Sequence, residues 1–254
     1  MALLELRGVA KSFGGLRVLD GVDLAVEAGT VHALIGPNGS GKTTLLNCVS
    51  GILAADAGTL RLADVVLDDL APHERTRLGL ARTFQNVRLF AGLSVLDNVL
   101  VGRHCRTHAG LLSAWTRPPF RRLPEERASR EAALALLALV GLAGRAREPA
   151  ESLPLADQRR LEIARALAAE PTLLLLDEPA AGMNATEKQG MNRLIRDVVG
   201  RGCTIVLVEH DVGLVMDVSS RVTVLNFGQK IADGSPASVR RDPLVVEAYL
   251  GQDA

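Results

Sequence analysis

Aromatic residues and cysteines are both scarce in this sequence. Only 3% of its 254 residues are aromatic, so an aromatic side chain on a predicted turn needs a specific explanation. The three cysteines, Cys48, Cys105 and Cys203, are scattered and lack the spacing of metal ligands. We therefore expect reduced thiols, as in a cytosolic protein, rather than a disulfide framework or a cysteine metal site.

Long apolar runs are also missing. The longest uncharged apolar run covers residues 132–143, which is too short to cross a bilayer. Glu5, Arg7 and Lys11 interrupt the apolar start of the chain, so we expect no signal peptide. Any link to a membrane is therefore expected to go through a partner protein.

An excess of charge of either sign is absent as well. The 29 basic residues balance the 29 acidic residues, which argues against a dedicated nucleic-acid binder. With 48% hydrophobic and 23% charged residues, the composition is that of a globular protein of one or two domains with a substantial core.

A glycine-rich stretch between residues 36 and 44 is the strongest feature that is present. It follows an apolar run, 31–35, and precedes a helical pattern, as the G-x-x-x-x-G-K-[ST] phosphate loop requires. Glycines allow backbone N–H groups to approach phosphate oxygens, and the positive N-terminus of the next helix points at the same anion. The predicted nucleotide-binding residues are Gly36, Pro37, Asn38, Gly39, Ser40, Gly41, Lys42, Thr43 and Thr44.

Within this loop, Lys42 is expected to reach the outer phosphates and the Thr43 hydroxyl to bind Mg²⁺. The alternative is a glycine-rich turn with a solvated lysine, which the complete spacing makes a poor explanation. The loop therefore predicts binding of a nucleoside triphosphate.

Polar residues follow two apolar runs that are typical of buried parallel strands. Asp177 and Glu178 follow the leucines at 173–176, and His210 follows the run at 204–208. Ligands bind at the carboxyl ends of such strands, so Asp177 is suited to hold Mg²⁺ through water and Glu178 to accept a proton from an attacking water. Capping of the following helix is the alternative for the two carboxylates, and a structural role is the alternative for His210.

The remaining pattern predicts the rest of an α/β fold. Alternating residues predict strands within 2–35 and a hairpin at 57–70, and Leu80–Phe84 reads as a buried strand leading to Gln85. Helical periodicity dominates from residue 94 to 144 and predicts an inserted helical subdomain with one long loop. That loop holds Trp115 and a basic cluster around Arg121, interpreted as a solvated face, with contact to a partner or anionic lipid as the alternative.

Phe13 and Gln85 carry weaker signals. Phe13 precedes a Gly-Gly turn and could stack on an adenine ring, but taken alone it is better explained as a loop residue folded onto the core. Gln85 at a strand end is, taken alone, an ordinary polar residue. A predicted helix at 158–170 is expected to have Asp157 as its N-cap.

In order and spacing, these motifs resemble those of the ATPase subunits of ABC transporters along essentially the whole chain. The resemblance implies that Phe13 stacks on adenine, that 36–44 is the Walker A motif and that Gln85 lies in the Q-loop, which senses nucleotide and contacts the permease. It implies that Glu178 is the catalytic base and His210 the histidine that meets the γ-phosphate. The implied Mg²⁺ ligands are Thr43, Gln85 and Asp177, the last of these through water.

The resemblance also implies the fold and its division. It predicts one ABC ATPase domain over 1–254, an α/β P-loop core with a mixed sheet and an N-terminal antiparallel part. The core is assigned to 1–91 and 152–254, and the helical subdomain to 92–151. Within the family, the sequence most resembles one ATPase of the bacterial branched-chain amino-acid importers. The stretches QRRLEIARAL and LDEPAAGMN are among those that carry this resemblance.

One segment departs from the family. The LSGGQ signature is replaced by a sequence with neither its hydroxyl nor its glycines: Leu153, Pro154, Leu155, Ala156 and Asp157. We therefore expect a heterodimer in which this chain's Walker A works with the partner ATPase's intact signature.

The resemblance predicts ATP and Mg²⁺ as cofactors and integral-membrane permeases as partners. It also predicts a second ABC ATPase, an indirect link to a periplasmic or extracellular solute-binding protein, and a place on the cytoplasmic face of the bacterial cell membrane. The alternatives are an ATPase of a urea or lipopolysaccharide transporter, a soluble ABC protein of DNA repair or translation, a regulatory module, and a P-loop kinase or GTPase.

Overall fold

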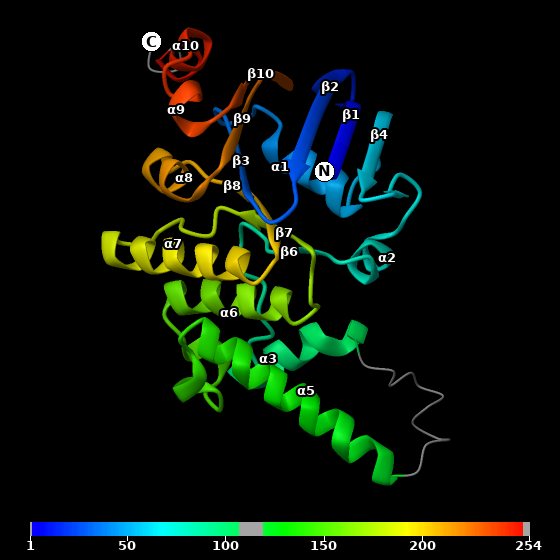
Figure 1. The fold of residues 1–254 in the computed structure, drawn as a ribbon, viewed down its shortest axis with the longest axis vertical. Coiled ribbons are helices and arrows are strands. Elements are labelled where there is room, and N and C mark those ends of the chain that lie inside the picture. Colours follow the sequence, from blue (N-terminus) through cyan, green and yellow to red (C-terminus); the bar gives the residue numbers. More distant parts are fainter. Residues whose placement is uncertain (1, 107–118, 251–254) are drawn as a thin grey trace.

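Three layers make up the fold, with a large sheet between a small sheet and a set of helices (Figure 1). The computed structural model describes residues 2–106 and 119–250. Trp115 and the neighbouring Arg117 lie outside the described residues, as does the side chain of Arg121, so the interpretation of the basic loop stays a prediction.

The small sheet is antiparallel, in the order β2-β1-β4-β5. Its strands are β1 (Ala2–Phe13), β2 (Leu16–Glu27), β4 (Ala57–Leu62) and β5 (Val65–Val66). Along β2 the exposed and buried residues alternate from Gly21 to Glu27, because successive side chains of a strand point to opposite faces. The predicted N-terminal strands and the hairpin after residue 57 are confirmed.

The large sheet has the order β10-β9-β3-β8-β7-β6 and is parallel except for β10. Its strands are β3 (Val31–Ile35), β6 (Leu80–Arg82), β7 (Leu173–Asp177), β8 (Thr204–Val208), β9 (Arg221–Asn226) and β10 (Gln229–Gly234). Every residue of β3, β7 and β8 is buried, as the continuous apolar runs predict.

Both faces of the large sheet are covered by apolar residues. In β7, Leu173 and Leu175 pack into the cluster shared with the small sheet and α1 (Lys42–Ser50). Leu174 and Leu176 face the other side, in the cluster shared with α7 (Ala185–Gly200). This two-sided burial places the carboxyl end of β7 in the middle of the molecule.

The strand predicted at Leu80–Phe84 is shorter than expected. β6 ends at Arg82, and a further backbone bond, from Thr83 N–H to the Leu175 carbonyl, continues along β7. Beyond it, the Phe84 ring lies 5.3 Å from the Arg82 guanidinium and 4.8 Å from that of Arg88. Phe84 therefore belongs to the loop that carries Gln85, where its ring contacts two arginines.

Helices fill the lower part of the molecule in Figure 1, and others lie between the two sheets or beside β9 and β10. Apart from α1 and α7 they are α2 (Pro72–Arg77), α3 (Val95–Gly102), α5 (Pro119–Leu139), α6 (Leu155–Leu167), α8 (Val212–Val218), α9 (Pro236–Val239) and α10 (Pro243–Leu250). Helix α6 packs on α3 and α5, and one apolar cluster joins these helices to the sheet. The assignment of 92–151 as a separate subdomain stays a proposal.

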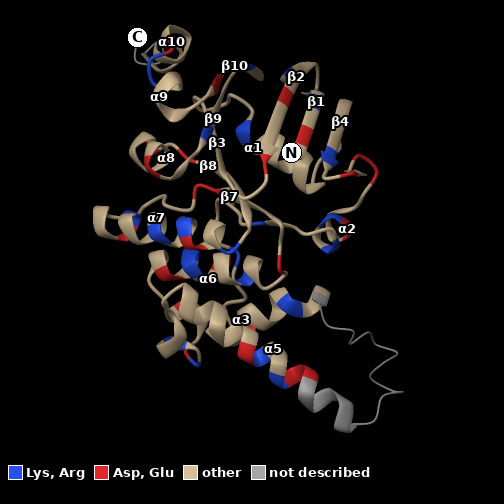
Figure 2. Cartoon of the chain, in the orientation of Figure 1, with Lys and Arg blue, Asp and Glu red and all other residues tan. Residues whose placement is uncertain are grey.

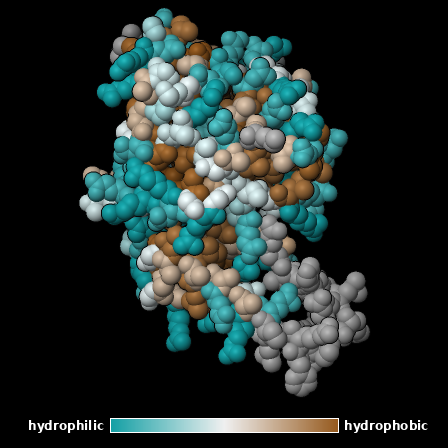
Figure 3. Space-filling view, viewed as in Figure 1, coloured by the Kyte–Doolittle hydropathy of each residue, from teal (hydrophilic) through white to brown (hydrophobic). Residues whose placement is uncertain are grey.

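Charged residues of both signs are interspersed along the described elements that Figure 2 shows. Lysine, arginine, aspartate and glutamate alternate over the described elements in Figure 2, and in Figure 3 hydrophilic residues break up the apolar areas of the visible face. Among residues 2–106 and 119–250, none of the helices is both long enough and apolar enough to cross a membrane.

Candidate functional site

The phosphate loop connects β3 to α1, as predicted. Gly36 has a φ of 149°, and a Cβ atom on it would lie 2.0 Å from the Leu225 carbonyl oxygen. Gly41, with a φ of 101°, would place a Cβ 2.8 Å from the Val18 carbonyl oxygen. No larger residue fits at either position without moving the backbone, so these glycines are required by both conformation and space.

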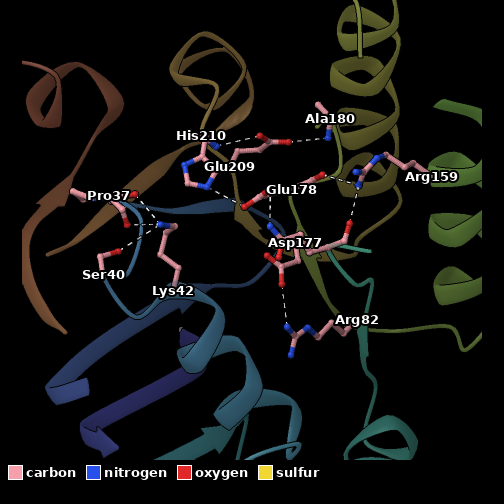
Figure 4. A network of polar contacts seen from close by, with 12 residues as sticks. Pro37, Ser40, Lys42, Arg82, Arg159, Asp177, Glu178, Ala180, Glu209 and His210 are labelled. Atoms are coloured by element: carbon pink, nitrogen blue, oxygen red, sulfur yellow. Dashed lines mark hydrogen bonds and ion pairs between the residues drawn. The ribbon is translucent and has the colours of Figure 1, made fainter. Parts of the chain in front are cut away.

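Lys42 is folded back onto its own loop. Its Nζ donates hydrogen bonds to the carbonyl oxygens of Gly36, at 2.7 Å, and Pro37, at 2.8 Å (Figure 4). Burial lowers the pKa of Lys42, while Glu178 and Asp177 oppose that effect. The lysine therefore sits at the centre of the loop, facing the carboxylates of β7, while Thr43 beside it is exposed.

Asp177 ends β7 as a buried carboxylate, and Arg82 is its one ionic partner among the described residues. Its Oδ2 accepts a hydrogen bond of 3.0 Å from Arg82 Nη2, and both side chains are almost completely buried. Its Oδ1 is buried too and has no partner among the described residues. Burial raises the pKa of Asp177, and the Arg82 guanidinium acts in the opposite direction.

Each carboxylate oxygen of Glu178 has a side-chain partner, and the two partners come from separate segments of the chain. Gln85 Nε2 donates to one carboxylate oxygen at 3.2 Å, and His210 Nε2 lies 2.9 Å from the other. The backbone of Glu178 has a φ of 49°, a left-handed conformation that is uncommon for a residue with a side chain. Such conformations are typical of functional sites, where the surroundings hold them in place.

The structure thus brings together the residues that the sequence predicts for catalysis. Gln85, Glu178 and His210 form one connected group, and Lys42 faces it in Figure 4. None of the hydrogen bonds links Asp177 to this group directly. It turns instead toward Arg82.

Sequence reasoning missed two further residues that support Glu178. Arg159 of α6 donates a hydrogen bond of 2.9 Å to the Glu178 carbonyl oxygen. Glu209, the neighbour of His210, accepts from the backbone N–H groups of Ala180 at 2.8 Å and of His210 at 3.1 Å. The available signal was weak, because charged residues on a predicted helix or loop are usually solvated.

Phe13 ends β1 on the predicted turn. Phe13 is 46% exposed, and the centroid of its ring lies 5.6 Å from Lys11 Nζ. The interpretation that Phe13, taken alone, is a loop residue folded onto the core is therefore wrong. Stacking on adenine stays a prediction.

The expectation that Asp157 is the N-cap of its helix is wrong. Helix α6 begins at Leu155, with Pro154 at the N-cap position and no side-chain cap. Asp157 is the third helical residue, and its carboxylate pairs with Arg145 at 2.9 Å and Arg160 at 3.5 Å. Pro154 precedes the helix, and its carbonyl oxygen accepts from the N–H groups of Asp157 at 3.0 Å and Gln158 at 2.9 Å.

The N-terminus of α6, which carries the signature segment, therefore differs from the expected one in its cap and its charge. The Asp157 side chain does not bind the free N–H groups at the N-terminus of α6. Arg145 and Arg160 offset its charge. Pro154, which has no N–H, and Leu155, whose bulky side chain is exposed, therefore remain the substitutions predicted to weaken this segment.

A Mg²⁺ ion fits the donors that the site offers. Hard cations prefer oxygen ligands, and Mg²⁺ is usually held by one or two protein oxygens together with phosphate oxygens and water. The exposed Thr43 hydroxyl and the unpartnered Asp177 Oδ1 are such oxygens, and the Gln85 side chain lies in the same region. The described residues contain no cluster of three histidine, cysteine or acidic side chains that could hold a metal instead.

Comparison with known proteins decides the family. The sequence pattern of the family described as ABC transporter matches residues 19–181, which is more than half of the chain. The chain belongs to the ABC transporter family of ATP-binding proteins. A second pattern, described as branched-chain amino acid ATP-binding cassette transporter, matches residues 229–254 of this ABC ATPase.

Curated relatives match nearly the full length of the ABC ATPase. The high-affinity branched-chain amino acid transport ATP-binding protein LivG of Escherichia coli (strain K12) is 42% identical, over 98% of both chains. BraF of Pseudomonas aeruginosa, with the same description, is 41% identical over 98% of both. The lipopolysaccharide export system ATP-binding protein LptB of Escherichia coli (strain K12) is 34% identical over 100% of this chain and 99% of LptB.

Solved structures confirm the predicted α/β fold. A nucleotide-free ATP-binding cassette from an ABC transporter is 31% identical, with a TM-score of 0.86 over 98% of this chain and 99% of that chain. The ADP conformation of an ATP-binding cassette of an ABC transporter is 32% identical, with the same TM-score over 99% of both chains. ATP-binding cassettes are the ATPases of transporters, and nucleotide binding belongs to this chain as a member of that family.

Proposed function

We propose that this chain binds and hydrolyses ATP to energise the uptake of a branched-chain amino acid through partner permeases. The observation that supports it most is the pair of contacts on Glu178, from Gln85 and His210, beside a complete phosphate loop. The 42% identity to LivG and the family match at residues 229–254 support the substrate class.

In the proposed mechanism the phosphate loop binds the triphosphate. Lys42 exchanges its two loop carbonyls for phosphate oxygens, and the N–H groups at the start of α1 face the same anion. Mg²⁺, held by Thr43 and Asp177 with Gln85 nearby, would neutralise charge that develops on the phosphates.

Glu178 accepts the proton of the attacking water in this mechanism. A general base must lie within hydrogen-bond reach of the water, and the left-handed backbone at Glu178 turns its carboxylate toward Lys42 and the phosphate loop (Figure 4). His210 orients that carboxylate through its 2.9 Å contact, and Gln85 holds the other oxygen until water and nucleotide arrive.

The proposal includes a set of partners and a location. The ATPase would dock on integral-membrane permeases at the cytoplasmic face of the bacterial cell membrane, paired with a second ABC ATPase. A periplasmic or extracellular solute-binding protein would deliver the amino acid to the permeases. The likeness to LptB keeps a lipopolysaccharide transporter as the second candidate, and the lower identity of 34% disfavours it.

Reconstitution tests the proposal. The chain, its partner permeases and a second ATPase would be reconstituted in liposomes that enclose ATP, with the solute-binding protein outside. Uptake of labelled leucine, isoleucine and valine would be compared with that of urea and a polar amino acid. Uptake of the branched-chain amino acids that depends on ATP and on Glu178 supports the proposal. ATP hydrolysis without any such uptake would overturn the substrate assignment and leave the ATPase assignment intact.

A further inference from the structure

Arg82 occupies a central position that neither the motifs nor the comparisons assign to it. Its guanidinium forms a fork: Nη2 binds Asp177 Oδ2 at 3.0 Å, and Nη1 binds Asn47 Oδ1 at 2.6 Å and Ser50 Oγ at 3.0 Å. One side chain therefore links the end of β7 to helix α1. Only 6% of the Arg82 side chain is exposed, so the link is shielded from water.

The α1 partners of Arg82 lie on the helix face that begins at Thr43. Residues four and seven positions apart share one face of an α-helix, and Asn47 and Ser50 are four and seven positions after Thr43. A contact that holds Asn47 and Ser50 against Arg82 therefore also fixes how far α1 is rotated about its axis. That rotation decides where the exposed Thr43 hydroxyl points.

The other end of the fork fixes Asp177. Because Arg82 binds only Oδ2, the carboxylate has one oxygen held and one, Oδ1, buried without a partner. An unpartnered, buried carboxylate oxygen is costly unless another group supplies the interaction. A metal ion or a water bound to it would do so.

We propose that Arg82 is a positioning residue that holds Thr43 and Asp177 in register for a single divalent cation. The guanidinium fork sets both the rotation of α1 and the orientation of the Asp177 carboxylate, and so prepares the cation site before nucleotide binds. This inference rests on the proposed nucleotide site, and it adds a residue that does not itself touch nucleotide or metal.

The proposal requires the shape of arginine as well as its charge. Arginine presents several N–H donors in one rigid plane and can bind partners on two elements at once. Lysine at this position would keep the charge near Asp177 but could not reach Asp177 and Asn47 together with the same geometry. Arg82→Lys therefore separates positioning from charge compensation.

Metal binding, measured without hydrolysis, tests the proposal. The purified full chain would be saturated with ADP, and Mn²⁺ binding to the complex would be followed by electron paramagnetic resonance. ADP affinity would be measured separately in EDTA. For Arg82→Lys we expect Mn²⁺ affinity to fall at least tenfold, with metal-free ADP affinity within twofold of the unmodified chain. Asn47→Ala, which removes one α1 contact, is expected to cause a smaller fall.

Arg75 provides a matched control. It is a second buried arginine bound to α1, where it donates to the carbonyl oxygens of Cys48 and Val49, and it makes no contact with Asp177 in the described hydrogen bonds. Arg75→Lys should lower the thermal unfolding midpoint and leave Mn²⁺ affinity within twofold. An equal fall in Mn²⁺ affinity for Arg75→Lys would overturn the proposal, because loosening of α1 would then suffice.

Two other results would also overturn it. One is an unchanged Mn²⁺ affinity in folded Arg82→Lys, and the other is a parallel loss of metal-free ADP binding, which would place the defect in the phosphate loop. An unmodified chain that binds no ADP would instead contradict the proposed function.

Discussion

His210 Nε2 and Glu178 Oε1 lie 2.9 Å apart, across the carboxyl ends of two neighbouring parallel strands. The contact exists because β7 and β8 pair in register, with Asp177 opposite Val208, so that the residues just beyond each strand meet. The predicted base and the predicted phosphate-sensing histidine are thus in direct hydrogen-bond contact.

Replacement of Glu178 should separate binding from hydrolysis. Glu178→Gln keeps the shape and can still bond His210 but cannot accept a proton, so ATP should bind normally while turnover falls by ~10²–10⁴-fold. Steady-state ATPase and equilibrium ATP binding measure the two effects, with Glu151→Gln on the exposed surface as the control. Unreduced turnover would show that another group is the base.

Replacement of Lys42 should act on binding itself. Lys42→Ala removes the cation at the centre of the phosphate loop, so ATP affinity should fall at least about tenfold, as expected for one lost charge-assisted hydrogen bond. Isothermal titration calorimetry with ATP checks this, and the exposed Lys230→Ala is the control. ATP affinity that is equal in both variants would contradict the assigned role.

Phe13 should contribute to binding of the base. If its half-exposed ring stacks on adenine, Phe13→Ala should weaken ATP binding by ~1–3 kcal/mol, the range for stacking of a base on an aromatic side chain. GTP should be affected similarly, because every purine offers a face. Leu16→Ala on the same hairpin is the matched control, and an unchanged ATP affinity in Phe13→Ala would leave the ring without a role in stacking.

His32 should make stability depend on pH. It is 1% exposed and bonds Thr223 Oγ1 at 2.8 Å, and burial lowers its pKa to about 4 from 6.5. Between these two pH values His32 is protonated in the unfolded chain but remains neutral in the folded chain. The free energy of unfolding therefore decreases as pH falls from 6.5 toward 4. The loss reaches about 3 kcal/mol.

The test compares the unmodified chain with His32→Gln, which cannot titrate. Urea unfolding at pH 7 and pH 4.5 gives the free energy of unfolding of each, and carboxylates that titrate in the same range cancel in the difference. The unmodified chain should lose more stability than the variant. Equal losses would mean that His32 is protonated without penalty in the folded chain.

The signature segment should make this chain depend on a partner. Pro154 offers no N–H and Leu155 adds bulk where the family has a serine and a glycine, so a homodimer would carry two poor signatures. We expect the chain alone to be nearly inactive, and its mixture with the second ATPase and the permeases to hydrolyse ATP through Glu178. Robust turnover by the chain alone would contradict this asymmetry.

Reversal of the substitutions tests the same prediction from within the chain. A variant with Pro154→Ser, Leu155→Gly, Ala156→Gly and Asp157→Gln restores the family's signature and should raise the ATPase rate of the chain alone. Asp157→Gln by itself should change little, because Arg145 and Arg160 already offset that charge. A larger effect from Asp157→Gln than from Leu155→Gly would show that charge, not bulk, limits the segment.

The sequence by itself determined the order of most strands and helices and where the residues of the candidate site fall along them. Periodicity and glycine placement are local properties, so the strands of 2–35, the phosphate loop and the buried strands before Asp177 and His210 could be predicted. So could the proximity of Glu178 and His210, since the carboxyl ends of parallel strands share one edge.

Only the tertiary structure decided how the charges of the site are paired. Arg82 and Asp177 are 95 residues apart in sequence and Arg159 and Glu178 are 19 apart, and nothing in local periodicity indicates either contact. The same holds for Asp157, which the sequence marks as an N-cap. Its arginine partner Arg145 and the start of α6 at Leu155 depend on how the preceding segment packs. Hydrogen bonds of long side chains depend on the distance between elements, and that distance is set by packing of the whole core.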